Sequence, residues 1–309
     1  MTQRSPINYP VTHSSTQQAW QHLSSQKSPP AFTIIFGPTA SGKSSLAYQL
    51  AAHFNANILS FDSRHVYRKM DVVTGKDRPT ETKKWQLFGL DLADPDQDFS
   101  VRHYYQYAKK VIEKQRQEQQ PLFLVGGSWL YAKTLLQPPD TLFAPTNLKL
   151  RQQLEKFNTL ELQIKVQADN PVAWQRFNNS DRHNPRRLIR AIETAQQINK
   201  KLVTQVKPLI LPNEYQLFII NPSLEKITKN IADRIRARLM TGALAETERL
   251  MQDYPDWSKP AFQSTGYALI KEYLQQNLSL AELQAKWLIQ EKNYAKRQQT
   301  WINKLLKQD

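Results

Sequence analysis

The stretch Gly37-Pro38-Thr39-Ala40-Ser41-Gly42-Lys43-Ser44 fits the pattern G-x-x-x-x-G-K-[ST], which is typical of a loop that wraps around a phosphate group. The apolar run Phe32–Phe36 before it predicts a buried strand, and Leu46, Leu50 and Phe54 after it predict one face of a helix. A strand, a tight turn and a helix start place backbone N–H groups and the positive end of a helix dipole around one anion. The stretch therefore predicts a phosphate or diphosphate site in an α/β fold, without identifying the reaction.

Residues within this loop have distinct expected roles. Gly37 and Gly42 let the backbone bend and approach a ligand closely. Lys43 adds a mobile positive charge, and the hydroxyl of Ser44 can bind a phosphate oxygen or a Mg²⁺ ion. A chance Gly/Ser-rich turn is the alternative, and the flanking strand and helix patterns disfavour it.

Composition limits the class of protein. The 309 residues suggest about two domains, and the net charge of +15 fits an acidic partner, nucleic acid first, although solvated lysines alone could produce that charge. The absence of cysteine excludes disulfides, a thiol nucleophile and a Cys-ligated zinc site. No apolar run approaches the roughly 18 residues that cross a bilayer. We expect a cytoplasmic protein that binds no membrane.

The N-terminal residues 1–30 are rich in Ser, Thr, Gln and Pro and lack the apolar stretch of a signal peptide. We interpret them as a mostly disordered tail, with a short helix possible over residues 19–23.

Asp62 follows a second predicted strand, residues 58–61. In doubly wound sheets, ligands bind beyond the carboxyl ends of the strands, so Asp62 is expected near the phosphate loop. A carboxylate there can bind Mg²⁺, take a proton or merely cap the following turn. The spacing alone leaves these three roles open.

A third buried strand, residues 121–125, ends in Gly126-Gly127-Ser128. ATPases with this loop usually place an acidic Mg²⁺-holding residue after such a strand, so its absence counts against an ordinary nucleotide hydrolase. The strand pattern returns at Tyr215–Ile220, and the following helix carries Arg234 beside its apolar stripe.

Between these strands, residues 138–206 are predicted to be a helical insertion in an α/β core of residues 31–137 and 207–309. Within it, Arg182, Arg186, Arg187 and Arg190 crowd around apolar positions. Such a helix is either a solvated basic face or a surface for the backbone of a polyanion, and the arginine density favours the second.

Together these runs resemble the tRNA dimethylallyltransferase family, in its bacterial form. The likeness rests on five separated segments and a weaker sixth, which follow the family's order from about residue 32 to residue 304. The segments are the phosphate loop; residues 62–76; residues 125–131; residues 184–193; residues 293–301; and Gly266-Tyr267.

The resemblance implies a P-loop NTPase-like parallel sheet with an inserted all-helical domain that grips the tRNA anticodon stem-loop. It implies transfer of a dimethylallyl group from dimethylallyl diphosphate to N6 of adenine-37, with release of diphosphate and help from Mg²⁺. The loop would then hold that diphosphate and not the phosphates of ATP. We expect a monomer.

The same resemblance assigns roles to individual residues. Asp62 matches the residue that takes the proton from the adenine amine, and Ser128 keeps a hydroxyl where threonine is usual. Around the diphosphate, the matching positions are Thr39, Lys43, Ser44 and Arg234. The residues implied in tRNA contact are Asp62, Ser63, Arg64, His65, Arg186, Arg187, Leu188, Ile189, Arg190, Gly266 and Tyr267. Three positions depart from the family pattern: Lys69, Trp129 and Ala268.

Three alternatives remain open at this point. An isopentenyltransferase acting on free AMP or ADP would have no reason to carry the arginine-dense insertion. A P-loop kinase of a small metabolite would turn over ATP without RNA. A nucleic-acid-binding protein with a relic loop would bind RNA without turnover.

Overall fold

The computed structural model describes residues 11–79, 85–199 and 205–306. Its strands form one six-stranded sheet in the order β1-β6-β2-β5-β3-β4, and every neighbouring pair is parallel. The strands are β1 (Val11–Ser14), β2 (Phe32–Phe36), β3 (Asn57–Ser60), β4 (Leu87–Phe88), β5 (Leu122–Gly126) and β6 (Tyr215–Ile220). The predicted α/β class with a parallel sheet is confirmed.

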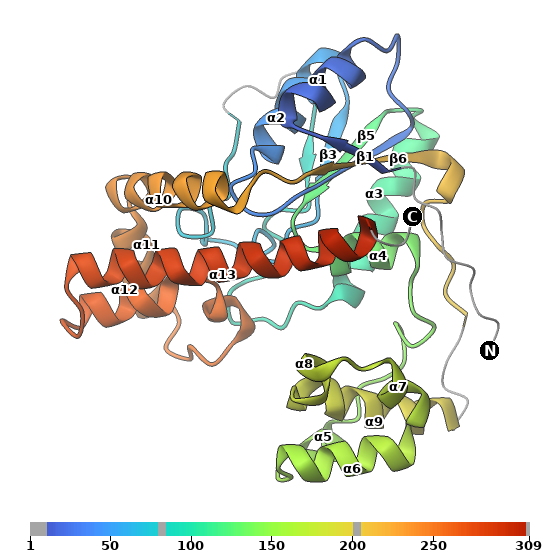
Figure 1. Cartoon of the computed structure of the whole chain (residues 1–309), viewed down its shortest axis with the longest axis vertical. Helices are drawn as coiled ribbons and strands as arrows, with labels where there is room; N and C mark the ends of the chain where they lie inside the picture. The colour runs from blue at the N-terminus through green and yellow to red at the C-terminus, as the bar shows by residue number, and fades with distance from the viewer. Residues whose placement is uncertain (1–10, 80–84, 200–204, 307–309) are drawn as a thin grey trace. The chain divides into compact units, whose positions relative to one another are not determined.

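Helices cover the sheet and continue beyond it. Those of the sheet-bearing part are α1 (Thr16–Ser24), α2 (Lys43–Phe54), α3 (Val101–Gln117), α4 (Trp129–Leu136), α10 (Leu224–Met240), α11 (Ala243–Asp253), α12 (Tyr267–Leu274) and α13 (Leu280–Leu306). Helices α10 and α13 pack side by side (Figure 1). A second group comprises α5 (Leu148–Leu154), α6 (Thr159–Asp169), α7 (Pro171–Arg176), α8 (Asn179–Arg182) and α9 (Pro185–Asn199).

The inner strands are apolar on both faces, as a parallel sheet covered by helices requires. Every residue of β2, β3 and β5 is buried. The four strands expected from the sequence are present: β2 and β6 have their predicted bounds, and β3 and β5 are each shifted by one residue. The prediction missed β1 and β4.

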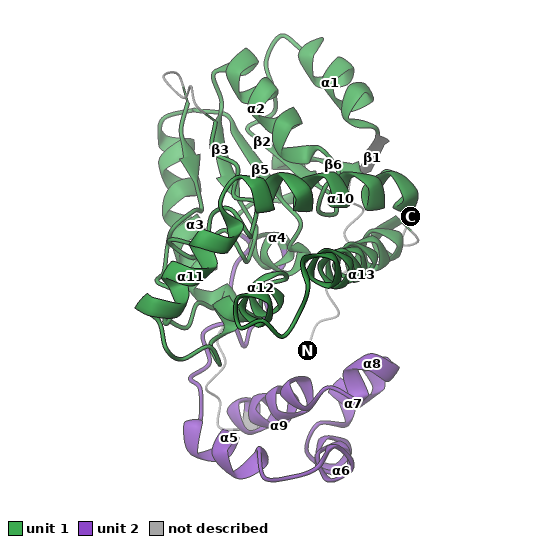
Figure 2. Cartoon of the chain, turned by 90° about the vertical axis from the view of Figure 1, so that its left-hand side faces the viewer, with its two compact units in different colours: residues 1–136, 209–309 green, residues 137–208 purple. Residues whose placement is uncertain are grey.

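The chain divides into two compact units: residues 1–136 with 209–309, and residues 137–208 (Figure 2). The second unit has its own apolar core, which includes Leu154, Leu162, Val166 and Leu188. The predicted insertion, residues 138–206, falls inside this unit. In the first unit, the N–H of Leu209 donates to the carbonyl of Leu135 at 2.7 Å, so the chain leaves and re-enters that unit at one place.

The expectation of a disordered tail over residues 1–30 is wrong for residues 11–30. Strand β1 adds to the edge of the sheet by pairing with β6, and α1 packs on α2. Ser15 caps α1, and the side chains of Ala19 and Leu23 are fully buried in the core. Two apolar side chains on one helical face therefore anchor a segment that is polar overall. Residues 1–10 lie outside the described residues.

Candidate active site

The phosphate loop connects β2 to α2, as its flanking patterns predicted. Two residues adopt a left-handed backbone: Gly42 (φ 86°), which needs no Cβ, and Ala40 (φ 58°). Asn230 of α10 donates to the carbonyl of Ala40 at 2.9 Å. The ammonium of Lys43 folds back onto the carbonyl of Pro38 at 3.1 Å. These two hydrogen bonds fix the conformation of the loop, and the ammonium group of Lys43 lies against the backbone of the loop.

Lys43 and Asp62 line one small pocket, together with Ser44, His65 and Asp77. Burial lowers the pKa of Lys43 from 10.5 to about 8, and the negative charge of Asp62 opposes that shift. A phosphate anion entering the pocket would favour the protonated amine. The loop lysine and the predicted base therefore share one electrostatic environment.

Asp62 lies two residues after the end of β3 and is partly buried. One of its oxygens, Oδ1, accepts the N–H of Arg64 at 2.9 Å. Burial alone would raise the pKa of Asp62, but His65, the Arg64 N–H and Lys43 together hold it below its ordinary value. Burial lowers the pKa of His65, and the charge of Asp62 opposes that shift.

Ser128, after β5, ties two strand ends together. Its Oγ accepts the N–H of Ser63 at 3.0 Å and donates to the Ser63 hydroxyl at 3.1 Å. Arg64 follows Ser63, and its guanidinium donates to the carbonyl of Pro260 at 3.1 Å. Asp62, Ser63, Arg64, His65 and Ser128 therefore gather at the carboxyl edge of the sheet, where the sequence led us to expect Asp62.

Arg234 reaches this edge from α10. Its Nη1 donates to the hydroxyl of Thr39 at 3.4 Å, and its Nη2 lies 3.9 Å from the carboxylate of Asp77. Burial and the neighbouring Arg238 lower its pKa, although about a third of the side chain stays exposed. Arg234 thus lies beside the phosphate loop with one donor group facing it.

Gln298 of α13 was given no individual role by the sequence, and it bridges two parts of the site. Its Oε1 accepts the N–H of Thr39 at 2.9 Å, and its Nε2 donates to the carbonyl of Gly127 at 3.0 Å. One turn earlier, burial and Asp62 raise the pKa of Tyr294 to about 12. The only signal for these roles was the run 293–301, which supported the resemblance.

The same pocket is the candidate site for a Mg²⁺ ion. The described residues contain no group of three or more His, Asp or Glu side chains placed to hold a metal. Ser44, Asp62 and Asp77 nonetheless share the pocket with Lys43. Mg²⁺ is usually held by one or two protein oxygens together with phosphate oxygens and waters, so this donor set fits the ion.

The predicted tRNA-binding residues of α9 separate into two groups. Arg186 and Arg187 are exposed, and Arg190 is half-buried. Arg187 pairs with Asp181, and Arg190 pairs with Glu193. Leu188 is fully buried and Ile189 is 8% exposed, so the expectation that their side chains touch tRNA needs correction: both pack in the core of the helical unit.

Gly266 and Tyr267 are also buried, against the same expectation. A Cβ atom on Gly266 would collide with the indole of Trp287, and Gly266 has φ of 102°, so glycine is required there for packing. Tyr267 is 0% exposed, and its hydroxyl donates to Glu246 at 2.7 Å. Its side chain therefore supports the structure from inside.

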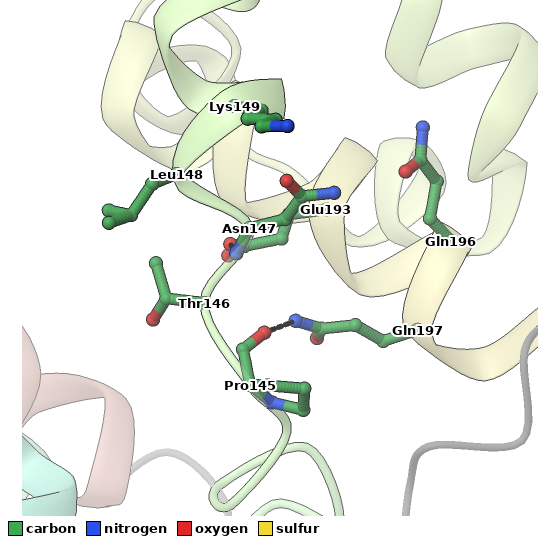
Figure 3. A pocket seen from close by; sticks show the side chains of 8 residues that line it. All are labelled: Pro145, Thr146, Asn147, Leu148, Lys149, Glu193, Gln196 and Gln197. Carbon is green, nitrogen blue, oxygen red and sulfur yellow. Dashed lines mark hydrogen bonds between the residues drawn. The ribbon is translucent and has the colours of Figure 1, made fainter.

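A larger pocket of about 370 Å³ lies within the helical unit (Figure 3). It is lined by the segment 145–149 and by Glu193, Gln196 and Gln197 of α9. The carboxylate of Glu193 is already engaged by Arg151 and Arg190, and Gln197 donates to the carbonyl of Pro145. Because Glu193 is already paired with two arginines, this pocket lacks the combination of a lysine and an aspartate that lines the pocket around Lys43.

The departures from the family pattern have structural explanations at two of three positions. Lys69 adopts φ of 61°, the left-handed conformation that favours glycine, and its ammonium pairs with Asp253 at 2.9 Å. Trp129 is buried, with its ring 5.0 Å from that of Phe36. Ala268 is exposed, and nothing in the structure explains its identity.

A parallel sheet with this loop after an inner strand, and a lysine and an aspartate in one pocket beside it, defines a P-loop fold. The chain matches the family described as IPP transferase over residues 65–305, and it belongs to that family. The resemblance drawn from the sequence is thereby confirmed.

Individual relatives agree with this assignment. The chain is 34% identical to the tRNA dimethylallyltransferase of Microcystis aeruginosa, with 88% of this chain and 85% of the relative covered. It is 32% identical to that of Acaryochloris marina, covering 88% and 89%. The solved tRNA isopentenylpyrophosphate transferase of Bacillus halodurans is similar, with a TM-score of 0.62 and 26% identity over 88% of this chain and 86% of that one.

Proposed function

We propose that this chain transfers a dimethylallyl group from dimethylallyl diphosphate to N6 of adenine-37, next to the anticodon of a tRNA, and releases diphosphate. The observation that supports this most directly is the pocket lined by both Lys43 and Asp62, a cation suited to bind a diphosphate and a candidate base. Relatives that match most of the chain carry the name tRNA dimethylallyltransferase.

Charge on the leaving group dictates what the loop must do. The bond between the allylic carbon and the diphosphate oxygen breaks while a bond from N6 to that carbon forms. The diphosphate leaves with the bonding electron pair, so its oxygens gain negative charge. Fixed N–H dipoles at the start of α2, Lys43 and Arg234 would stabilise that charge without reorganising.

Asp62 would take the proton that N6 must lose. The exocyclic amine of adenine is a poor nucleophile because its lone pair is delocalised into the ring, so proton transfer would accompany bond formation. Asp62 uses one oxygen for the Arg64 N–H and is held ionised, which suits it to accept the proton. The adenine must leave its stack to reach the pocket, as in other enzymes that modify bases.

Mg²⁺ is the expected cofactor. Ser44 and either Asp62 or Asp77 would hold it together with diphosphate oxygens. When bound, the ion would neutralise charge on the leaving diphosphate.

The helical unit is the proposed grip on the anticodon stem-loop. Exposed Arg186 and Arg187 on α9 suit sequence-independent contact with phosphates. No helix among the described residues is long and apolar enough to cross a membrane. We also propose that the protein works as a monomer in the cytoplasm.

Incubation with dimethylallyl diphosphate and an anticodon stem-loop bearing A36-A37-A38, followed by mass measurement of the RNA, tests the function. The expected product gains one dimethylallyl group on A37. Modification of free AMP or ADP in preference to the RNA would favour the rival isopentenyltransferase. ATP turnover stimulated by a small metabolite would favour the kinase. RNA binding without any product would favour the relic loop.

A further inference from the structure

Glu246 of α11 is a buried carboxylate that the proposed chemistry does not use. It is 4% exposed, and it accepts hydrogen bonds from four groups. Its Oε2 accepts the N–H groups of Asp71 at 2.8 Å and Val72 at 2.6 Å, and its Oε1 accepts the N–H of Val73 at 3.0 Å. The hydroxyl of Tyr267 donates to Oε1 at 2.7 Å. One carboxylate thus holds three consecutive backbone amides and a phenol.

These amides belong to a tight turn, residues 71–75, that lies downstream of Asp62. The N–H of Gly75 donates to the carbonyl of Val72 at 3.1 Å, and the N–H of Lys76 donates to that of Asp71 at 2.8 Å. Successive N–H groups in such a turn form a concavity that binds an anion. Here the anion is supplied by the protein itself, so the turn is fixed to α11 and α12.

The opposite side of the turn lies against Arg234 and Arg238 of α10. Gly75 has φ of 66°, and a Cβ atom on it would overlap the guanidinium groups of Arg234 and Arg238. Arg238 is held by Glu291 at 3.1 Å, whereas Arg234 extends to the hydroxyl of Thr39 in the phosphate loop. The turn is therefore the surface against which Arg234 rests, and its position limits where that guanidinium can lie.

We propose that Glu246 and Tyr267 are positioning residues for the transfer reaction, which hold the turn 71–75 against Arg234 and thereby keep its guanidinium beside the phosphate loop. This rests on the proposed function. It also gives Tyr267 a role different from the tRNA contact that the resemblance implied.

The negative charge of Glu246 matters as well as its shape. A glutamine has one acceptor oxygen, and its NH₂ group would face a backbone N–H, so at least one donor of the turn would lose its partner. The turn would shift, and Arg234 would lose its packing contact with Gly75. Glu246→Gln is therefore the informative variant, and exposed Glu248→Gln on the same helix is its matched control.

The experiment measures binding of dimethylallyl diphosphate by calorimetry, stem-loop affinity, and single-turnover transfer, all on the full chain. Glu246→Gln is expected to weaken dimethylallyl diphosphate binding by about tenfold to a hundredfold, the range seen when a residue that orients a metal ligand from behind is removed. Tyr267→Phe should weaken it by about threefold to tenfold, the net value of one hydrogen bond. Stem-loop affinity and the Glu248→Gln control should stay at the parent's values.

A double-mutant cycle separates positioning from general damage. If Glu246 acts through Arg234, then Glu246→Gln should cost no further diphosphate affinity in an Arg234→Ala background. Additive losses would overturn the proposal. If Glu246→Gln does not fold, the same cycle with Tyr267→Phe decides.

Two other results are also decisive. A Tyr267→Phe variant that loses stem-loop affinity while binding dimethylallyl diphosphate normally would return Tyr267 to the RNA surface and refute the inference. A parent protein that binds dimethylallyl diphosphate but modifies no RNA would refute the proposed function alone, because the binding cycle does not depend on turnover.

Discussion

The buried amine of Lys43 has a pKa of about 8 in the free protein, and this value should make diphosphate binding depend on pH. A bound diphosphate favours the charged amine and raises that pKa. Below pH 8 the amine is protonated with or without ligand, so affinity should be level. Above pH 8 the free protein loses the proton that the complex keeps, so affinity should fall with rising pH, by up to tenfold per unit.

Calorimetry with dimethylallyl diphosphate between pH 7 and 9.5 measures this effect. Lys43→Arg is the control, because its side chain stays charged over the whole range and its affinity should not show the same fall. A level profile in the parent, or an equal fall in the arginine variant, would assign the pH dependence elsewhere.

Two of the three roles that the sequence left open for Asp62, a cap and a base, can be separated by mutation. Its Oδ1 does accept the N–H of Arg64, so a cap bond exists. Asp62→Asn keeps an acceptor for that bond and removes the base. Single-turnover transfer should therefore fall by roughly 10²–10⁴, with a melting temperature close to the parent's. Normal transfer in Asp62→Asn, with instability in Asp62→Ala, would leave only the cap.

At the scale of elements, the arginines of α9 do not form one uniform surface. Arg186 is exposed, whereas Arg190 pairs with Glu193 and donates to the carbonyl of Thr141 at 3.1 Å. Arg186→Gln should flatten the slope of log affinity for the stem-loop against log salt by about 0.7–0.9 and leave the melting temperature unchanged. Arg190→Gln should also lower the melting temperature, because Glu193 is 0% exposed and loses a charged partner. Equal slopes for parent and Arg186→Gln would remove Arg186 from the RNA surface.

Helix α1 supplies the second element-scale prediction. Leu23 is fully buried in a core that includes Leu46, Leu50 and Phe218. Leu23→Ala should lower the free energy of unfolding by about 2–5 kcal/mol, as in other buried leucine truncations. Exposed Gln21→Ala on the same helix should change it by less than about 0.5 kcal/mol. Urea unfolding measures both, and equal effects would mean that α1 does not stabilise the core.

At the scale of the whole molecule, the sequence predicted the structures that are determined by residues close together in the chain. The strand, phosphate loop and helix around Lys43 are adjacent in the chain, and their patterns placed them correctly. Strand β4 has two residues, too short for a periodic signal, and β1 has the mostly polar sequence Val-Thr-His-Ser. Gln298 meets Thr39 across 259 residues, and Glu246 meets Asp71 across 175. Such partners are set by packing between distant helices, which no local pattern encodes.

The two-unit organisation leads to a prediction about separable binding functions. The residues around Lys43, Asp62 and Arg234 all lie in the first unit, and the basic helix α9 lies in the second. Because Leu209 bonds to Leu135, a short glycine–serine linker can replace residues 137–208 without stretching the first unit. The apolar core of the first unit shares no residue with the core of the helical unit, so it should stay intact.

This shortened chain is expected to fold and to bind dimethylallyl diphosphate within about threefold of the full chain, less than 1 kcal/mol. Its stem-loop affinity should fall steeply, because the phosphate contacts proposed for α9 would supply much of the salt-dependent binding energy. Calorimetry with dimethylallyl diphosphate and a fluorescence titration with the stem-loop measure the two effects separately. Loss of diphosphate binding in a chain that still melts cooperatively would mean that the helical unit helps to build the catalytic pocket. Retention of full stem-loop affinity would place the RNA surface on the first unit.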